Sequence, residues 1–530
     1  MSALIPMPAT AAVPVTTPRP MPNLRAMIGV GAVLLGTLTS LLNARLLDIG
    51  LADIRGALGV GVDEASWLTT AYVVAEVAAI PSAVWLRSIL SPARGVLIGA
   101  MIFTVASFLA PFSPDLPTLI GLQAVRGLSA GVLMPMAYAV VMRHMPQHLR
   151  LYALSFYALV SSLTPSISAS IEGWIMTHLS WEYLFWINVI PGSLTLLAGA
   201  YGLASDPIRF LRFRRHDGFG LLALSLGLAA LVTALDQGNR LDWLGSGLIV
   251  GLLASAGFLL GVYLVHALCH RDPVVSPRLL ARDNIGLSLL VLFAMRIGLM
   301  TSAFLIPQYL IRVQGYRALE SGDVFLVSAL PQVVLTPLVA WLVYRIDPRN
   351  LLVFGLILFG AGVLMLTGLT SLWIGEQLLP ALLVQSVAAP FAAVPLMVLM
   401  TEEISLREIP WIASLVHITR TTGTAVGVAL VGTFTRKQEQ LHSALIGLNV
   451  ERGAAPVQAR LDAVAASLRA QGVDPATAGA KATATLAGTI QREAFVMAYA
   501  DMFLLIGLMI AAMALVTLFM YRPKLPGKFL

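Results

Sequence analysis

About fourteen apolar stretches follow one another along this chain of 530 residues, and each is long enough to cross a membrane as a helix. About 20 helical residues span the ~30 Å hydrocarbon core, where only helices and closed barrels satisfy their backbone hydrogen bonds. Charged residues make up 12% of the chain, whereas soluble domains carry about 25%. The sequence therefore predicts an all-α polytopic membrane protein. The expected spans lie near residues 26–48, 66–86, 93–112, 117–142, 151–176, 182–203, 218–235, 244–266, 285–307, 322–344, 351–371, 376–400, 411–433 and 495–520.

The loops between these stretches predict an orientation, because lysine and arginine collect in cytoplasmic loops. Arginines and acids occupy alternating loops over most of the chain. The arginines are Arg87, Arg94, Arg143, Arg150, Arg209, Arg212, Arg214, Arg215, Arg345 and Arg349, and the acids opposite are Asp53, Asp63, Glu64, Asp115, Asp236 and Asp242. This alternation predicts a multi-pass protein with both termini in the cytoplasm. We expect it in the cell inner (cytoplasmic) membrane. The net charge of +7 belongs to these loops, so no nucleic-acid partner is expected.

A short pattern repeats after 256 residues and predicts the domain organisation. Pro81, Trp85, Leu86, Pro92 and Gly99 recur as Pro337, Trp341, Leu342, Pro348 and Gly355. The second span is thus equivalent to the tenth, so eight helices separate the halves where a plain six-helix repeat would have six. Chance similarity between apolar segments is the alternative. The repeat predicts a 6+2+6 arrangement: a six-helix bundle (26–203), a two-helix insertion with flanking cytoplasmic loops (204–283) and a second six-helix bundle (284–530). The start of the chain is rich in proline and nearly uncharged, which predicts a disordered cytoplasmic tail (1–25).

A single arginine, Arg126, lies inside the fourth stretch, Leu119–Val140. A guanidinium at the centre of a bilayer costs about 2.5–3.5 kcal/mol, so Arg126 must face protein or a water-filled cavity. Gly127 and Gly131 follow it with the spacing that lets two helices approach closely. Arg126 is therefore either a structural partner of a neighbouring acid or a gate or cavity residue of a transporter.

Several motifs resemble those of one transporter family. The pattern LxxLQxxRGxxAG, which begins at Leu119, is similar to the fourth-helix motif of the major facilitator superfamily. Further segments similar to family signatures are Asn43–Pro81, Trp181–Gly192, Asp217–Gly220, Leu235–Trp243, Ile306–Gly315, Arg420–Gly427 and Ala498–Phe503. With the 6+2+6 repeat, the chain is identified as a member of the fourteen-helix drug:proton antiporter branch, the EmrB/QacA type.

The resemblance implies a secondary active transporter that exports amphipathic organic compounds by proton antiport with alternating access. Its partners would be the small-molecule substrate, protons, the lipid bilayer and a periplasmic adaptor (membrane-fusion) protein in envelopes with two membranes. No HExxH, CxxC or GxxxxGK[ST] pattern is present, so neither an enzyme nor a cofactor is expected. An uptake or substrate-sensing protein of the same fold, not coupled to protons, stays open.

The sequence departs from the family at the residues that carry its antiporter motif. In the fifth helix Ser168 and Ala169 stand where Gly-Pro is expected, and Glu172 stands where a glycine is expected. In the first helix Asn43 replaces a frequent aspartate, and the loop after the second helix has no acid. Proton coupling is therefore implied by the resemblance and not by these positions.

Ionisable groups inside the spans form the candidate site, since such groups mark substrate and proton pathways by default. The proton-coupling and cavity candidates are Glu76, Arg126, Glu172, Asp48 and Arg45, and the substrate-cavity candidates are Asn43, Tyr72, Arg296, His417 and Arg420. Each group alone could be a structural pair or a residue that reaches the interface, above all Arg45 and Asp48. Glu76 has no basic residue within a turn of its own helix. We hypothesise that Glu76 carries the proton and that Arg126 approaches it in one of two states.

Residues 434–492 predict a helical insert on the outer side of the membrane. Pro456 opens one helix with an apolar stripe, Gly472 closes it, and Asp474–Pro475 starts a second helix towards the last span. The stripe predicts either a self-packed lid or a docking surface.

Overall fold

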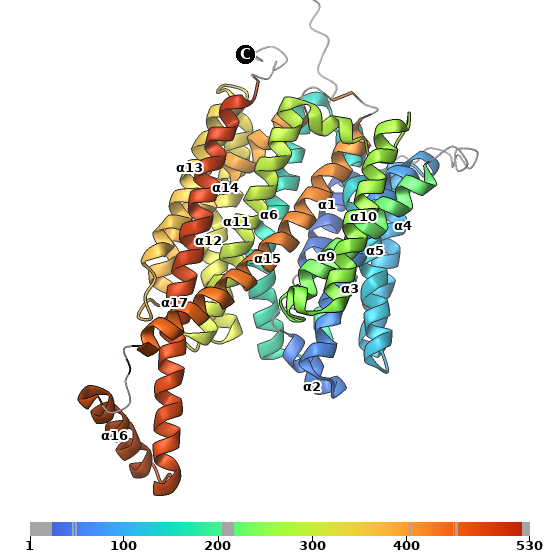
Figure 1. Cartoon of the computed structure of the whole chain (residues 1–530). Helices are drawn as coiled ribbons and strands as arrows, with labels where there is room; N and C mark the ends of the chain where they lie inside the picture. The colour runs from blue at the N-terminus through green and yellow to red at the C-terminus, as the bar shows by residue number, and fades with distance from the viewer. Residues whose placement is uncertain are drawn as a thin grey trace, which may run out of the picture.

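The computed structural model describes residues 24–44, 47, 50–203, 217–401, 404–405, 408–448, 450 and 454–521 (Figure 1). These residues form helices and connections, with no β-strand among them. The α-helices are α1 (Leu24–Asn43), α2 (Leu51–Leu58), α3 (Val62–Ile89), α4 (Pro92–Leu109), α5 (Leu116–His144), α6 (Gln147–His178), α7 (Tyr183–Trp186), α8 (Val189–Gly202), α9 (Gly218–Gly238), α10 (Gly247–Cys269), α11 (Asp283–Arg312), α12 (Ala318–Leu342), α13 (Pro348–Leu364), α14 (Gly375–Thr401), α15 (Ile409–Leu448), α16 (Ala455–Ala470) and α17 (Pro475–Val516). Short 3-10 helices are η1 (Ala110–Phe112), η3 (Trp243–Gly245), η4 (Pro277–Ala281), η5 (Met365–Gly368) and η6 (Thr517–Phe519).

The count of membrane-spanning helices agrees with the sequence prediction. In the described part of the chain, 12 helices are long and apolar enough to cross a membrane. A thirteenth is α6, whose two parts, Leu149–Thr164 and Ser166–His178, are bent by 47° relative to each other. We assign the fourteenth span to α15, a more polar helix of 40 residues that packs against α3, α5, α11 and α17.

The spans form two bundles and an inserted pair, which confirms the 6+2+6 arrangement. In the first bundle α5 packs against α3 and α4, while α8 packs against α1 and α4. In the second, α13 packs against α14 and α17, and α15 packs against α11 and α17. The bundles meet where α6 contacts α12 and where α3 contacts α15. The pair α9–α10 lies beside both bundles, because α9 contacts α3 and α15 (Figure 1).

The repeated motif occupies equivalent places in the two bundles. Pro81 lies inside α3 and Pro337 inside α12. Pro92 and Pro348 each open the next helix, where a proline is tolerated because the first N–H has no helical acceptor. The side chains of Ser91 and Asp347 cap those two helices by accepting backbone hydrogen bonds. The sequence repeat therefore corresponds to equivalent helices in the two bundles.

Two glycines of α5 bring it into direct contact with α3. A Cβ atom at Gly127 would lie 2.2 Å from the carbonyl oxygen of Tyr72, and one at Gly131 would lie 2.1 Å from that of Glu76. Real Cβ atoms do not approach backbone oxygens this closely, so only glycine fits at either position. The predicted small-residue contact is confirmed, and it holds α3 and α5 together as one unit.

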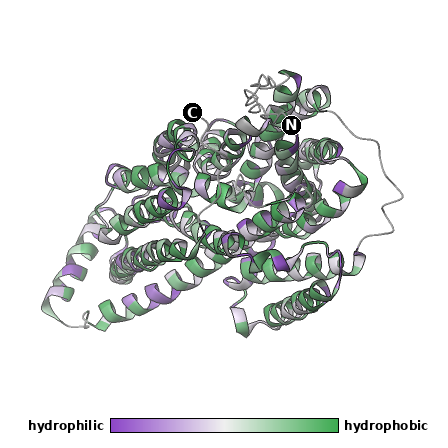
Figure 2. Cartoon of the chain, turned by 90° about the horizontal axis from the view of Figure 1, so that it is seen from above, coloured by the Kyte–Doolittle hydropathy of each residue, from purple (hydrophilic) through white to green (hydrophobic). Residues whose placement is uncertain are grey.

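The insert consists of extensions of two spans and one separate helix. Both α15 and α17 are much longer than the ~20 residues that cross the hydrocarbon core. Between them α16 packs against α17, ending at a turn where Gly472 has φ +86°. The C-terminal end of α17 and the helix α16 lie at opposite ends of the molecule (Figure 1). Seen from above, the peripheral helices carry mainly hydrophobic residues, whereas the projecting arm carries more hydrophilic ones (Figure 2).

Candidate functional site

Arg126 is fully buried inside the first bundle and is held by amides and aromatic rings. Its guanidinium donates to Gln123 Oε1 at 2.7 Å and to Asn43 Oδ1, and it lies 5.3 Å and 5.0 Å from the ring centres of Phe103 and Phe185. Cation–π contacts of this kind gain strength when the charge is desolvated. Within the described chain, its hydrogen-bond acceptors are thus amide oxygens on its own bundle, and Arg126 connects α5 to α1.

Glu76 forms an ion pair that joins the two bundles. Its Oε1 lies 3.1 Å from Nη2 of Arg420, so α3 of the first bundle contacts α15 of the second through opposite charges. The sulfur of Met134 lies 2.8 Å from the same nitrogen. No base lies within a turn of Glu76 on its own helix, but the opposite bundle supplies one. Arg420 thus pairs with Glu76 here, whereas the hypothesis named Arg126 as the arginine that approaches it.

A central cavity of about 150 Å³ surrounds this ion pair. Four charged side chains line it, and the rest of its wall is apolar or carries a hydroxyl. The lining residues are Leu41, Ala44, Thr69, Val73, Glu76, Ser161, Thr164, Asp236, Arg296, Met300, Phe304, Arg420, Thr421, Thr424, Ala425 and Val428. Such a wall can hold an amphipathic compound, because apolar side chains provide contact area and a few polar groups fix its orientation.

A second, smaller cavity of about 60 Å³ shares Arg296 and Arg420 with the first. His417 lines it one helical turn before Arg420, as their spacing predicts. The His417 Nε2 is hydrogen-bonded to the hydroxyl of Tyr157 on α6, and the two rings meet edge to face with centres 5.9 Å apart. His417 therefore bridges the two bundles beside the ion pair.

The other predicted residues lie apart from the cavity. Tyr72 donates its hydroxyl hydrogen to the carbonyl oxygen of Ser40 at 2.9 Å, which ties α3 to α1. Glu172 is buried and its Oε1 accepts from the backbone N–H of Gly50 at 2.8 Å. Asn43 holds Arg126, as described above. Arg45 and Asp48 lie outside the described residues. The structure thus brings together Glu76, Arg296 and Arg420, with His417 adjacent to them.

Sequence reasoning missed Asp236, which it assigned to an outer loop. Helix α9 continues to Gly238, so Asp236 lies in its last turn and lines the central cavity. The Leu235–Trp243 segment could have drawn attention to Asp236, because it resembles a family signature at a helix end. That resemblance does not show which way the side chains point.

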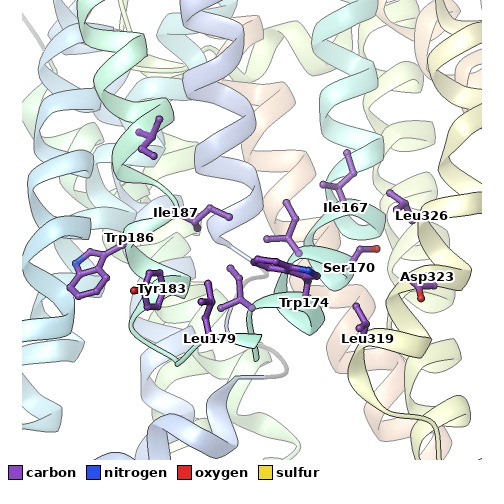
Figure 3. Close-up of a pocket in the computed structure, with 13 residues that line it drawn as sticks. Ile167, Ser170, Trp174, Leu179, Tyr183, Trp186, Ile187, Leu319, Asp323 and Leu326 are labelled. Carbon is purple, nitrogen blue, oxygen red and sulfur yellow. The ribbon is translucent and has the colours of Figure 1, made fainter. Parts of the chain in front are cut away.

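A larger cavity of about 590 Å³ lies away from these charges, between α6, α7, α8 and α12 (Figure 3). Its wall is nearly all apolar or aromatic, with Ser170 and Asp323 as the exceptions. Trp174 is half exposed and Ile190 is 72% exposed, so the cavity opens on the outer surface of the bundles. It suits an apolar chain, and it contains none of the residues of the central cavity.

The described residues contain no cluster of three His, Cys, Asp or Glu side chains arranged to hold a metal ion.

Comparison with known proteins gives consistent results. A family model described as Major Facilitator Superfamily matches residues 33–271 and 288–447. The colistin resistance protein EmrB of Acinetobacter baumannii is 23% identical over 495 residues, covering 93% of this chain and 96% of that protein. The multidrug export protein EmrB of Escherichia coli K12 is 25% identical over 428 residues, covering 80% and 83%. The fatty acid resistance protein FarB of Neisseria gonorrhoeae is 25% identical over 475 residues, covering 89% and 91%.

Solved structures share the fold at low sequence identity. A proton-dependent oligopeptide transporter superposes with a TM-score of 0.56 at 14% identity, covering 94% of this chain and 98% of that one. The proton:xylose symporter XylE superposes with a TM-score of 0.55 at 11% identity, covering 92% and 95%.

Proposed function

Because the chain belongs to the Major Facilitator Superfamily, we propose that it is a secondary active transporter that exports amphipathic organic compounds in exchange for protons. The observation that carries this proposal is the central cavity, in which a charge pair from opposite bundles is surrounded by apolar side chains. The names of the relatives, which include multidrug export and fatty acid resistance proteins, support an export direction and an amphipathic substrate.

In an alternating-access cycle the Glu76–Arg420 ion pair can control when Glu76 binds a proton. In this fold the two bundles rock about a site near the middle of the membrane, so a contact between bundles is made in one state and broken in another. Glu76 moves with the first bundle and Arg420 with the second. When the bundles separate around the site, the Glu76 carboxylate loses its partner and takes up a proton; when they close, Arg420 returns and the proton leaves.

Arg126 has a different task in this scheme. It lies on α5, which the glycine contacts hold against α3, so Arg126 and Glu76 travel together. An arginine that stays with the carboxylate cannot switch its protonation. We therefore assign the switch to Arg420, and we assign to Arg126 the task of holding α1 and α5 together through Asn43.

Everted membrane vesicles test the function directly. Substrate addition to energised vesicles should release stored protons, reported by a pH-sensitive dye, for members of a panel of amphipathic compounds. Accumulation against the gradient should stop when the proton gradient is collapsed. Uptake of the same compounds into whole cells, in place of export, would favour the uptake protein of the same fold.

We further propose that the protein lies in the inner membrane with both termini in the cytoplasm, its bundles at 26–203 and 284–530 moving as two bodies beside the insertion 204–283. The chain has a single cysteine, Cys269, exposed at the end of α10 that lies on the proposed cytoplasmic side. Cysteines placed at Leu244 or Arg460 in a Cys269→Ser background should react with a membrane-impermeant thiol reagent added outside. Native Cys269 should react only after the membrane is permeabilised. External labelling of Cys269 would reverse the orientation.

The insert is proposed to contact a periplasmic adaptor protein. Its apolar stripe is already covered, since Leu461, Val464 and Leu468 of α16 pack around small buried residues of α17. The stripe itself is therefore not the docking surface, and the outward, more polar face of the hairpin takes that role. The projection of this hairpin beyond the bundles supports a contact made away from the membrane.

Deleting residues 453–488 tests the adaptor contact. The variant should fold, bind substrate and exchange protons in everted vesicles, because the insert lies outside the bundles. It should nevertheless give no drug resistance to cells, since export across the whole envelope needs the adaptor. A variant with a flexible linker of the same length serves as the control for chain connectivity. Full resistance from the deletion variant would leave the hairpin as a lid only.

A further inference from the structure

The last turn of α9 and the two residues that follow it are bonded to both bundles at once. On the side of the first bundle, Gln237 Nε2 donates to Thr70 Oγ1 at 2.5 Å and Arg240 forms an ion pair with Asp63 at 3.2 Å. On the side of the second bundle, Thr433 Oγ1 donates to Asn239 Oδ1 at 2.7 Å, and Asn239 Nδ2 donates to the carbonyl oxygen of Ala429 at 3.0 Å. The inserted helix α9 is thus bonded to both α3 and α15, beside the place where these two helices contact each other.

Within that turn Asp236 is directed into the central cavity. Its Oδ2 accepts a hydrogen bond from Thr70 Oγ1, which fixes the carboxylate beside α3. It lines the cavity together with Glu76, Arg296 and Arg420. The wall of the cavity therefore comes from three parts of the molecule, the two bundles and the inserted pair.

The four charged groups of the cavity balance one another. Arg296 and Arg420 stay protonated, since arginine does not lose its proton in proteins. Two carboxylates, Glu76 and Asp236, oppose them in a region where apolar neighbours weaken the screening of charge. Without Asp236 the arginines outnumber the acids, and the cavity repels any compound that carries a positive charge.

We propose that Asp236 is a specificity-determining residue of the transport site, whose carboxylate offsets the arginines and so admits positively charged amphipathic compounds. The inserted pair α9–α10 then contributes a residue to the transport site and does not only pack against the bundles. This inference rests on the proposed function, and it assigns the compounds' charge preference to a helix outside both bundles.

Two probes of the same shape and opposite charge test the charge preference. Tetraphenylphosphonium and tetraphenylborate differ in charge and hardly in size, so their ratio of affinities reports electrostatics. By Coulomb's law at an effective dielectric constant of ~20 over ~10 Å, Asp236→Asn should lower the affinity of the purified protein for the cation about 15-fold and raise that for the anion by a similar factor, so that the ratio of the two affinities falls about 250-fold. The control is Asp242→Asn, which removes the same charge from an exposed position in the following loop where asparagine fits the φ of 60°. An unchanged ratio in Asp236→Asn overturns the inference.

A second measurement does not depend on transport. A cysteine at Thr424, which lines the cavity, is introduced in the Cys269→Ser background. Its reaction rates with a positively and a negatively charged methanethiosulfonate reagent report the local potential. Adding Asp236→Asn should lower the ratio of cation to anion rates about 250-fold by the same Coulomb estimate, and adding Asp242→Asn should leave it unchanged. If every variant fails to transport while this ratio falls, the proposed function is wrong and the charge assignment stands. If transport works and the ratio does not fall, the inference on Asp236 is wrong.

Discussion

Replacing Glu76 by glutamine should abolish uphill export while substrate binding persists. Glutamine keeps the size of the side chain and an oxygen that can accept from Arg420, but it cannot take up and release a proton. Everted vesicles containing Glu76→Gln should therefore bind an amphipathic dye, lose the pH dependence of that binding, and fail to concentrate the dye when energised. The measurement pairs equilibrium binding with energised transport, so a folding defect is visible as a loss of both.

Glu76→Gln should also lower the free energy of unfolding, and this loss tests whether Arg420 is the partner of Glu76. Glu76→Gln removes the carboxylate that contacts the largely buried guanidinium of Arg420, and removing one member of a buried pair costs about 3–5 kcal/mol. The remaining hydrogen bond of the amide reduces that cost. Adding Arg420→Gln should recover much of the thermal stability without recovering export. An additive loss of stability in the double variant would show that the two residues are not coupled.

Glu172→Gln is the matched control for the proton site. Glu172 is also a buried carboxylate of the first bundle, but its Oε1 accepts from the Gly50 backbone and lies away from the central cavity. Glutamine can keep that hydrogen bond, so energised export should continue. If Glu172→Gln stops uphill export while Glu76→Gln does not, the proton site belongs to α6.

Replacing Gly131 by alanine should destabilise the whole first bundle. The added Cβ would lie 2.1 Å from the carbonyl oxygen of Glu76 and 2.9 Å from the Cβ of Ala79, and the first of these is backbone that cannot rotate away. The helices must then separate, which also displaces Glu76 from the cavity. Overpacking of a tight interior costs about 1–3 kcal/mol, and a backbone clash belongs at the upper end. The expected result is a lower unfolding temperature in detergent and less folded protein in the membrane.

Gly121→Ala provides the control on the same helix. A Cβ at Gly121 meets nothing within 4 Å, and alanine favours the helical state, so this variant should be as stable as the parent or more stable. A comparison of the two substitutions separates the effect of the α3–α5 contact from any general effect of alanine in α5. Equal unfolding temperatures for both variants would contradict the close contact.

The sequence alone predicted the features that depend on short stretches of chain. The spans follow from apolar length, the close contact follows from the spacing of Gly127 and Gly131, and the 6+2+6 plan follows from the repeated prolines. The two helices of the insert follow from Pro456, Gly472 and the Asp474–Pro475 start.

The charge pairs could not be predicted in this way. Glu76 and Arg420 are 344 residues apart, and the periodicity of one helix shows which residues share its face but not which helix faces them. For Arg126 the sequence left open a pair with a neighbouring acid or a place in a gate or cavity, and it did not indicate the amide oxygens and aromatic rings that hold it. Asp236 was misplaced because sequence locates a helix end only to within a few residues, and here that error decides whether the side chain faces solvent or the cavity.

The length of α17 has a mechanical consequence. It runs without a break from Pro475 in the insert to Val516 in the second bundle, about 63 Å at 1.5 Å per residue. Gly507 lies against Gly360 inside the bundle and is about 48 Å from the outer end of the helix. If α17 tilts as one rigid helix by ~10° about the Gly507–Gly360 contact, its outer end at Pro475 moves by about 8 Å. A small rotation of the second bundle would therefore move the helical insert by several ångströms, because α17 is one continuous helix that joins them.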